Sequence, residues 1–440
     1  MLREVTLPVS VSRVLEVFRP CFTAPTFETF TALVAGLVAQ PVGRTVCGML
    51  TGAGLARVWH HCRAHRFFST ARWCPRQFGL VMAELIVTHL LGPGERITVV
   101  IDDTLFRRRG KKVHGAGWFH DGSAAGQVKV GFGNNWVVAA IIVTVPYLSR
   151  PVALPVLATL AVKGARSKPD LARDLVDALA ERFGDRGIDV VGDAAYGCGA
   201  FAGLGDDMTM TTRARSNAVF SEMAPPRTGK RGRPRLKGER IGTATDIAAS
   251  ATGKTLTVAR YGTTATVQVT ERVCLWYGTW RTDPVRVILV RDTRRTTSPT
   301  SGYDLALVTT DLTATPAQII TRYAARWSIE VTFFDVKNIL GVGQARNRVR
   351  KAVERTVPFG LLCHSLLIIW YFLHGHPATD TTRRRASAPW YSSKTQPSTL
   401  DMLTKLRHQI IAARFLPSTP RPATTEEILE VQQAWALAAA

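Results

Sequence analysis

The interval between residues 96 and 192 has an apolar pattern that restricts the chain to an α/β fold. Three β-branched or apolar runs are each long enough for one strand: 96–101, 136–145 and 152–162. An amphipathic helix is predicted for 168–183, with Ser167 as its N-cap, and a short fourth strand for 188–191. Strands that lie on both sides of a helix in the sequence predict a mixed sheet flanked by helices.

Changes in composition divide the chain into segments. Residues 1–92 have apolar residues at helical spacing and predict an all-helical N-terminal DNA-binding domain, which ends at a Gly-Pro-Gly break. A stretch rich in Pro, Gly and Arg, followed by alternating strands, predicts a β-rich insertion at 216–305. The insertion divides the α/β region into a first part, 93–215, and a second part, 306–376.

The C-terminal part contains an uncharged stretch long enough to be compared with a membrane span. No Lys, Arg, Asp or Glu occurs between Arg355 and Asp380, and the apolar centre covers 359–373. A span needs about 20 residues, so we predict a buried core helix and no membrane association. The remaining residues, 377–440, are interpreted as a polar linker and two helices, near 399–414 and 425–438.

The chain is strongly basic. It has 56 Lys and Arg residues against 33 Asp and Glu, a net charge of +23, which is typical of a protein that binds nucleic acid. The seven cysteines include no CxxC pair, so we interpret them as reduced thiols of a cytoplasmic, nucleoid-associated protein. One group of side chains does not match a zinc-binding spacing and is not interpreted as a zinc site: His60, His61, Cys62, His65 and Cys74.

A long helix predicted for 315–340 carries four polar residues at offsets 0, 3, 7 and 14: Tyr323, Arg326, Glu330 and Lys337. At about 100° per residue, these positions fall within roughly 60° of one another. The ordinary interpretation of such a stripe is a solvated charged face. Apolar residues surround this one, however, and a carboxylate between Arg and Lys in apolar surroundings stays ionised. The stripe therefore suits a metal ligand or a phosphate-binding face.

Aspartates follow two of the predicted strands. Asp102 and Asp103 come directly after the run at 96–101, and Asp193 follows the run at 188–191. A single Asp at a strand end is more often a turn residue. Two such ends together with Glu330 form a hard-oxygen ligand set for Mg²⁺ or Mn²⁺. On a chain this basic, the substrate that fits such a set is a phosphodiester.

These residues resemble a known family. The stripe is similar to the Y-(2)-R-(3)-E-(6)-K pattern of IS4-type insertion-sequence transposases, and IDDT and VVGDAAYG resemble the first and second aspartate motifs of that group. The residues after IDDT look closest to the related IS701 group. The resemblance covers about residues 97–345. It implies a DDE transposase with an RNase H-like fold and a β-rich insertion before the last catalytic helix.

The resemblance also implies roles for individual residues. Two Mg²⁺ or Mn²⁺ ions would be held by Asp103, Asp193 and Glu330. The catalytic Asp of the first motif is the one followed by Thr, which selects Asp103, whereas chemistry alone leaves Asp102 equally suitable. The remaining residues of the stripe would contact DNA phosphates near the transposon end: Tyr323, Arg326 and Lys337.

Basic and aromatic residues outside these motifs are further candidates. We expect Arg107, Arg108 and Arg109 to bind the DNA backbone near the active site. A second basic segment contains RGRP, the core of minor-groove AT-hook peptides, and we interpret it as a general phosphate-binding loop, with minor-groove binding as the alternative: Lys230, Arg231, Arg233 and Arg235. Trp276 and Trp280 in the insertion are candidates for stacking on a flipped base, with sheet packing as the alternative.

The predicted function is metal-dependent cleavage and strand transfer of an insertion sequence, by a cut-and-paste route through hairpin ends. The partners would be double-stranded DNA, as transposon ends and target, and a second copy of the chain in a homodimer. Two alternatives stay open: an RNase H-like nuclease without strand transfer, and a non-catalytic DNA-binding protein derived from a transposase. The presence of all three carboxylates argues against the second alternative.

Overall fold

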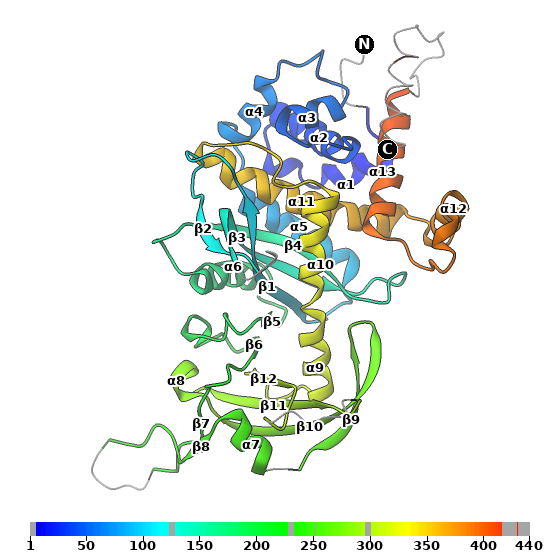
Figure 1. Cartoon of the computed structure of the whole chain (residues 1–440). Helices are drawn as coiled ribbons and strands as arrows, with labels where there is room; N and C mark the ends of the chain where they lie inside the picture. Colours follow the sequence, from blue (N-terminus) through cyan, green and yellow to red (C-terminus); the bar gives the residue numbers. More distant parts are fainter. Residues whose placement is uncertain are drawn as a thin grey trace.

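A mixed β-sheet forms the middle of the molecule, with helices at one end and the insertion at the other (Figure 1). The computed structural model describes residues 6–122, 128–227, 233–250, 252–294 and 301–415, and residue 429. The described strands form one sheet of 12 strands. The mixed sheet, flanked by helices, is an RNase H-like fold, as predicted.

Five strands make up the core of this sheet, in the order β4-β3-β1-β5-β6. The pairs β1·β3 and β3·β4 are antiparallel, whereas β1, β5 and β6 are parallel. The short strand β2 (Gly117–His120) also pairs with β3. Helix α6 (Lys168–Arg182) connects β4 to β5 and begins at the predicted N-cap, Ser167, whose hydroxyl accepts from the Asp170 N–H. The core strands are β1 (Ile97–Arg107), β3 (Val130–Val143), β4 (Val152–Ala161), β5 (Ile188–Gly192) and β6 (Met208–Arg213).

The insertion extends the same sheet. Strand β12 (Leu305–Thr309) pairs with the core strand β6 on one side and with β11 of the insertion on the other. The long hairpin β9–β10 and the short strands β7 and β8 complete the sheet. The elements of the insertion are β7 (Phe220–Ser221), β8 (Arg240–Gly242), α7 (Ala244–Ser250), β9 (Lys254–Arg260), β10 (Thr263–Leu275), α8 (Tyr277–Trp280) and β11 (Pro284–Asp292).

The helical end contains both N-terminal and C-terminal helices. Helix α11 (Arg350–His374) packs against α1, α4, α5 and α13 and against strand β4, so the N-terminal helices share a continuous apolar core with the rest of the chain. Among the described residues, α11 is the one helix long and apolar enough to cross a membrane, but almost all of its apolar window is buried inside the protein. The other helices here are α1 (Val9–Glu16), η1 (Arg19–Cys21), α2 (Ala24–Ala39), α3 (Val46–Gly52), α4 (Cys62–Ser69), α5 (Pro75–Leu90) and α13 (Thr399–Phe415).

Three local predictions are wrong. Strand β1 does not end before the aspartates but continues to Arg107, because its partner β3 pairs with it along that whole length. The predicted polar linker contains a helix, α12 (Pro377–Ser387), and a 3₁₀ turn, η4 (Pro389–Tyr391). The long helix predicted for 315–340 is interrupted. The helix predicted near 425–438 lies outside the described residues, apart from residue 429.

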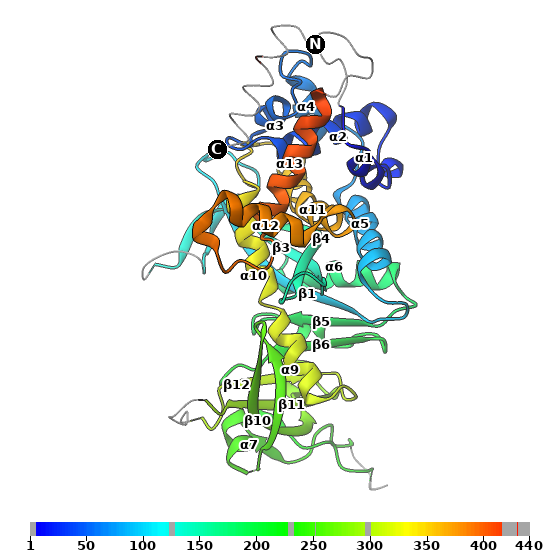
Figure 2. The same cartoon turned by 90° about the vertical axis from the view of Figure 1, so that its right-hand side faces the viewer.

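The interrupted helix connects the insertion to the helical end. Helix α9 (Pro316–Ala325) begins with a capping box between Thr315 and Gln318, as expected for a helix with Pro in its first turn. After a break at Arg326 and Trp327, the chain continues as α10 (Ser328–Phe334) and then as a π-helical turn, η3 (Asp335–Ile339). Figures 1 and 2 show α9 and α10 as one column along the sheet. A π-helical turn within a helix often marks a functional site.

Candidate active site

Asp102 and Asp193 lie side by side on neighbouring strands. In the parallel pair β1·β5, Ile101 is opposite Gly192, and the next residue in each case is an aspartate: Asp102 on β1 and Asp193 directly after the end of β5. Adjacent strands are about 4.8 Å apart, which brings the two carboxylates close together. Asp193 accepts a hydrogen bond from the Ala195 N–H at 2.8 Å, and this turn ends the strand.

Glu330 comes to the same place from the first turn of α10, where its side chain is exposed. The position of α9 is fixed by Arg322, which forms ion pairs with Asp189 of β5 at 3.0 Å and with Asp311 at 2.9 Å. Burial opposes the ionisation of Asp311, but the Ala314 N–H and the Arg322 guanidinium outweigh it and lower its pKa to about 2. This buried network therefore anchors α9, the helix directly before the one that carries the glutamate.

Arg326 is paired with Asp102 and feels the charge of the other two carboxylates. Its Nη1 lies 3.2 Å from Oδ2 of Asp102, and the two side chains are 13% and 12% exposed. Burial alone would lower the pKa of Arg326. Tyr323 and the negative charges of the Asp102, Asp193 and Glu330 carboxylates outweigh burial and raise the pKa. The carboxylates thus act on one guanidinium from β1, from the end of β5 and from α10.

Asp102 is a buried acid that is costly to ionise. Burial raises its pKa to about 7, and the neighbouring Glu330 and Asp193 carboxylates add to the effect, which Arg326 and the Asp103 N–H only partly offset. A site that needs more positive charge and offers only carboxylate oxygens fits a hard divalent cation such as Mg²⁺ or Mn²⁺. Within the described residues, the three ligand oxygens do not come within 4.8 Å of one another as a group.

Asp103 points away from this group. Successive side chains of a strand point to opposite faces of the sheet. Its Oδ2 accepts from Lys168 Nζ of α6 at 2.6 Å and from Asn135 Nδ2 of β3 at 3.0 Å. The Tyr196 side chain lies nearby. Burial is the main cause that raises its pKa well above the ordinary value, and the carboxylates of Asp103, Asp102 and Asp193 add to the effect. The structure therefore brings Asp102, and not Asp103, to the face of Glu330 and Arg326.

Lys168, Asn135 and Tyr196 were not predicted as site residues. They come from α6, β3 and the turn after β5, and no spacing in the sequence connects them to the aspartates. One signal was available. Had the strand been extended beyond residue 101, its alternation would have separated Asp102 from Asp103.

The other residues of the polar stripe lie close to Glu330 but are only partly open. Tyr323 is 8% exposed and packs in an apolar cluster, with the Arg326 guanidinium 5.7 Å from its ring centroid. Lys337 is half-buried on the π-helical turn, and burial lowers its pKa against the opposing charges of Asp121 and Glu330. Its Nζ lies 5.5 Å from the ring centroid of Phe106. The stripe therefore lines the site and is not a solvated face.

The three arginines after β1's aspartates differ in their surroundings. Arg107 is exposed but paired with Asp121 at 2.9 Å. Arg108 donates to the carbonyl oxygens of Gly343 and Ala345 and to Asn134, and burial lowers its pKa. The guanidinium of Arg108 thus ties β1 to the chain after α10, and binding of DNA by this residue stays a prediction. Arg109 is exposed.

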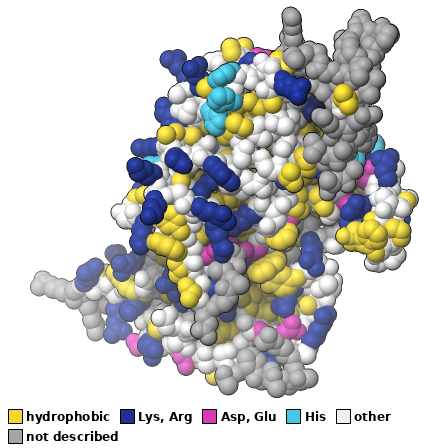
Figure 3. Space-filling model, turned by 45° about the horizontal axis from the view of Figure 1, so that its top comes forward, with side chains coloured by type: hydrophobic (Ala, Val, Ile, Leu, Met, Phe, Trp, Pro, Cys, Tyr) yellow, Lys and Arg dark blue, Asp and Glu magenta, His cyan; other side chains and the backbone are white. Residues whose placement is uncertain are grey.

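The second basic segment is partly described. Arg233 and Arg235 are exposed, and Arg235 lies 3.2 Å from Glu239 in an exposed ion pair. Lys230 and Arg231 lie outside the described residues. Figure 3 shows one face of the molecule on which Lys and Arg side chains gather on several sides of a small acidic area. Such a face suits a polyanionic partner.

Base stacking by the two tryptophans is not supported by their positions. Trp276 is 5% exposed and Trp280 is fully buried, with their ring centroids 5.2 Å apart. The Trp280 indole N–H donates to the Cys198 carbonyl, and Trp276 also packs against Phe220. Both rings are buried, so the prediction is corrected to sheet packing, the alternative considered from the sequence.

Comparison with known proteins bears on the same region. Residues 17–281 match the family described as DDE superfamily endonuclease. The matched residues contain Asp102, Asp103 and Asp193 and end before α9, so Glu330 lies outside them. No curated protein matches the chain.

Proposed function

The chain belongs to the DDE superfamily of endonucleases, and on this premise we propose that it is a transposase. It cuts double-stranded DNA at the ends of an insertion sequence and joins the released 3′ ends to target DNA. The observation that carries the proposal is that Asp102 and Asp193 lie side by side at the ends of paired strands, with Arg326 on Asp102 and the Glu330 carboxylate close enough to act on both.

Enzymes of this superfamily use divalent metal ions, and we propose two Mg²⁺ or Mn²⁺ ions here. Asp102, Asp193 and Glu330 are the residues that would hold them. We choose Asp102 in place of Asp103 because Asp103 is already neutralised by Lys168 on the other face of the sheet. Ions in such a site activate the attacking oxygen and stabilise the leaving oxygen of an in-line displacement at phosphorus.

The other residues bind and orient the DNA. Arg326 and Lys337 supply positive charge beside the carboxylates, where a phosphodiester would otherwise be repelled. Arg109, Arg233 and Arg235 are exposed and suited to the DNA backbone further from the reacting phosphate. Arg326 and Lys337 would therefore hold the reacting phosphate, whereas the exposed arginines would provide affinity for DNA of any sequence.

Finer features of the proposal rest on the resemblance of the polar stripe and aspartate motifs. On that resemblance we propose a transposase of the IS4/IS701 group of insertion sequences, which acts in the cytoplasm as a homodimer on paired ends. The second strand would then be cut through a DNA hairpin. These features concern the reaction products and the assembly. An experiment that contradicts one of them would leave the proposed endonuclease activity unaffected.

The test uses linear DNA that carries the inverted repeats bracketing the gene, incubated with the full chain and Mg²⁺. We expect nicked ends, hairpin ends and joined products from the wild type. Asp193→Asn and Glu330→Gln should bind this DNA but not cut it. Glu181→Gln, which changes an exposed carboxylate on α6, is the matched control and should cut normally.

Each alternative has its own outcome. Full cleavage by Asp193→Asn or Glu330→Gln would remove that residue from the mechanism. Cleavage without joined products would make the protein a nuclease without strand transfer. Wild-type protein that binds the DNA without metal-dependent cleavage would be a non-catalytic DNA-binding protein.

A further inference from the structure

A row of basic side chains begins beside the candidate active site and continues onto the insertion. Arg213 is the last residue of β6 and is exposed. Burial raises the pKa of Tyr323 in the polar stripe, and the charge of Arg213 is among those that oppose this rise. Two residues later, the exposed Arg215 donates from Nε to the carbonyl oxygen of Ala194 at 3.3 Å. The row therefore reaches the residue directly after Asp193.

Three adjoining hollows in the surface follow this row. The first lies between the turn after β5 and the chain around α8, and it is lined by Arg215 and Arg281. The second shares Arg215 with the first and is also lined by Lys237 and Tyr277. The third shares Lys237 and Tyr277 with the second and ends at residues 233–235 of the second basic segment. We refer to these connected hollows as the insertion groove.

The insertion groove is positively charged. Among the described residues that line it, the one carboxylate is Glu239, which is paired with Arg235 at 3.2 Å. Within the described part of the chain, no ion pair neutralises Arg215, Lys237 or Arg281. A groove of one sign of charge attracts a ligand of the opposite sign. The basic residues of the groove are all exposed: Arg215, Arg233, Arg235, Lys237 and Arg281.

Tyr277 holds two of these cations in the middle of the groove. Nζ of Lys237 lies 5.0 Å, and Cζ of Arg281 6.0 Å, from the centroid of its ring. An aromatic ring attracts cations to its negative face but leaves their charge available to a ligand. Arg281 also has a left-handed backbone, with φ of 56°. The arginine at this position therefore carries a backbone strain that glycine would not have.

We propose that the insertion groove binds the phosphate backbone of the DNA that occupies the active site, through Arg215, Lys237 and Arg281. This inference rests on the proposed function, because the groove begins beside Asp193 and would bind the same DNA. Guanidinium groups suit phosphate oxygens, to which they can donate two parallel hydrogen bonds. Phosphate contacts position DNA without reading its sequence. The groove thus fixes the path of the DNA from the reacting phosphate to the second basic segment.

The sequence did not indicate this groove because its residues are far apart in the chain. Arg215 follows β6, Lys237 precedes β8, and Arg281 follows α8. None of the three belongs to a basic run or to a motif. Only the folded insertion brings them around the ring of Tyr277.

The test measures the affinity of the full chain for labelled DNA that carries one inverted repeat, at several salt concentrations. Arg215→Gln, Lys237→Gln and Arg281→Gly should each weaken binding at least about threefold and reduce the slope of log affinity against log salt by about 1. Tyr277→Leu should also weaken binding, because it releases two cations. Tyr277→Phe keeps the ring and should restore most of that affinity.

Two variants separate loss of the groove from other effects. Lys254→Gln removes an exposed positive charge of β9, also in the insertion, that does not line the groove, and should change neither affinity nor slope. Arg281→Gly should not lower the melting temperature, since glycine adopts this backbone conformation without strain. Weaker DNA binding by Arg281→Gly therefore cannot result from unfolding.

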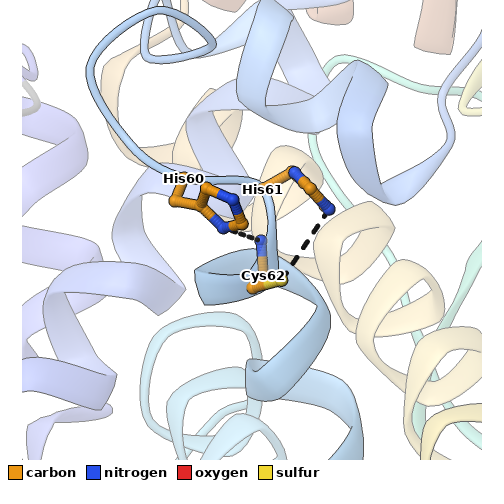
Figure 4. Close-up of side chains that lie close together, drawn as sticks. All are labelled: His60, His61 and Cys62. Atoms are coloured by element: carbon orange, nitrogen blue, oxygen red, sulfur yellow. Dashed lines mark hydrogen bonds between the residues drawn. The ribbon is translucent and has the colours of Figure 1, made fainter.

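The binding buffer contains a chelator because of a group of side chains on the helical end. His60, His61 and Cys62, at the start of α4, have ligand atoms within 4.8 Å of one another. Figure 4 shows the His61 ring and the Cys62 sulfur facing each other. A transition-metal ion there would add positive charge and alter DNA affinity independently of the groove. The chelator also prevents metal-dependent cleavage, so binding is measured on intact DNA.

The length of the DNA tests the path itself. In a series of DNAs shortened from each end, the wild type and the three charge variants should bind the shortest members equally, because these no longer reach the groove. Unchanged affinity and salt slope in all three variants, or a loss no larger than that of Lys254→Gln, would overturn the proposal. Wild-type binding that depends on the groove would support it even if the cleavage assay rejected the proposed function.

Discussion

The guanidinium of Arg326 donates to the carboxylate of Asp102, with Nη1 3.2 Å from Oδ2, and both side chains are largely buried. A buried carboxylate is costly to ionise without a positive charge beside it, and here Arg326 supplies that charge for Asp102 and also attracts the more distant carboxylates of Asp193 and Glu330. In the metal-free chain, Arg326 therefore reduces the repulsion between these carboxylates. In the enzyme that we propose, bound divalent ions would do the same. The first three predictions test this relationship.

The two neighbouring aspartates should differ in activity. We expect Asp102→Asn to lower the rate of metal-dependent DNA cleavage by at least about a thousandfold, because it removes a ligand from the face of Glu330. Asp103→Asn should retain measurable cleavage, since it only breaks the pair with Lys168. Single-turnover cleavage of labelled DNA measures both. The reverse order of activity would restore Asp103, the choice made from the family resemblance.

Asp102→Asn should also change the pH dependence of stability. Because the folded-state pKa is about 7 and the ordinary pKa of an aspartate is 3.8, the folded protein binds more protons between these values, and the wild type loses stability as pH rises through this window. The asparagine variant lacks that loss. It should be more stable than the metal-free wild type at pH 8, by about 1–3 kcal/mol, and not at pH 4. Urea denaturation with a chelator measures this, and an equal gain at both pH values would contradict it.

Arg326→Gln should strengthen the binding of divalent cations. Removing a positive charge that acts on Asp102, Asp193 and Glu330 should raise the affinity for Mn²⁺ at least about tenfold. Calorimetric titration of the DNA-free protein measures the affinity. Arg109→Gln removes an exposed positive charge and is the control, with little change expected. Unchanged or weaker Mn²⁺ binding by Arg326→Gln would show that the guanidinium does not compete with the metal.

Arg108 and Arg109 should separate stability from DNA binding. Arg109→Ala should weaken DNA binding and reduce the slope of log affinity against log salt by about 1, as for the loss of one phosphate contact. Arg108→Ala should instead lower the melting temperature, because it leaves the Gly343 and Ala345 carbonyls without their donor. Binding isotherms at several salt concentrations and thermal unfolding measure the two effects. A salt slope altered by Arg108→Ala alone would reverse these roles.

Asp311→Asn should destabilise the fold at neutral pH. The lowered pKa of Asp311, about 2 against an ordinary value of 3.8, stabilises the folded chain by about 2 kcal/mol above pH 4, and this contribution is lost as the pH falls toward 2. The variant should therefore lose about 1–2 kcal/mol at pH 7, and progressively less below pH 4. Denaturant unfolding measures the loss. Asp177→Asn, in an exposed ion pair on α6, should change stability by less than about 0.5 kcal/mol.

Much of the fold could be predicted from the sequence because its signals are local. The apolar runs in β1, β3, β4 and β5, the Ser167 N-cap and the Thr315 capping box each depend on residues a few positions apart. The same patterns made Asp193 and Glu330 candidates, and the RNase H-like arrangement was implied by the family resemblance. Local patterns also identified α11 as an apolar core helix.

The site itself was decided by contacts between residues far apart in the chain. Whether Asp102 or Asp103 faces Glu330 depends on the pairing of β1 with β3, which continues past both aspartates to Arg107. The residues next to the aspartates do not specify this pairing. Arg108 and Arg109 are chemically identical, and only the carbonyls after α10 distinguish them. Sequence by itself therefore determined which elements and candidate residues exist. Tertiary structure decided which side chains share a face, because the direction of a side chain and its burial depend on the partners of its whole element.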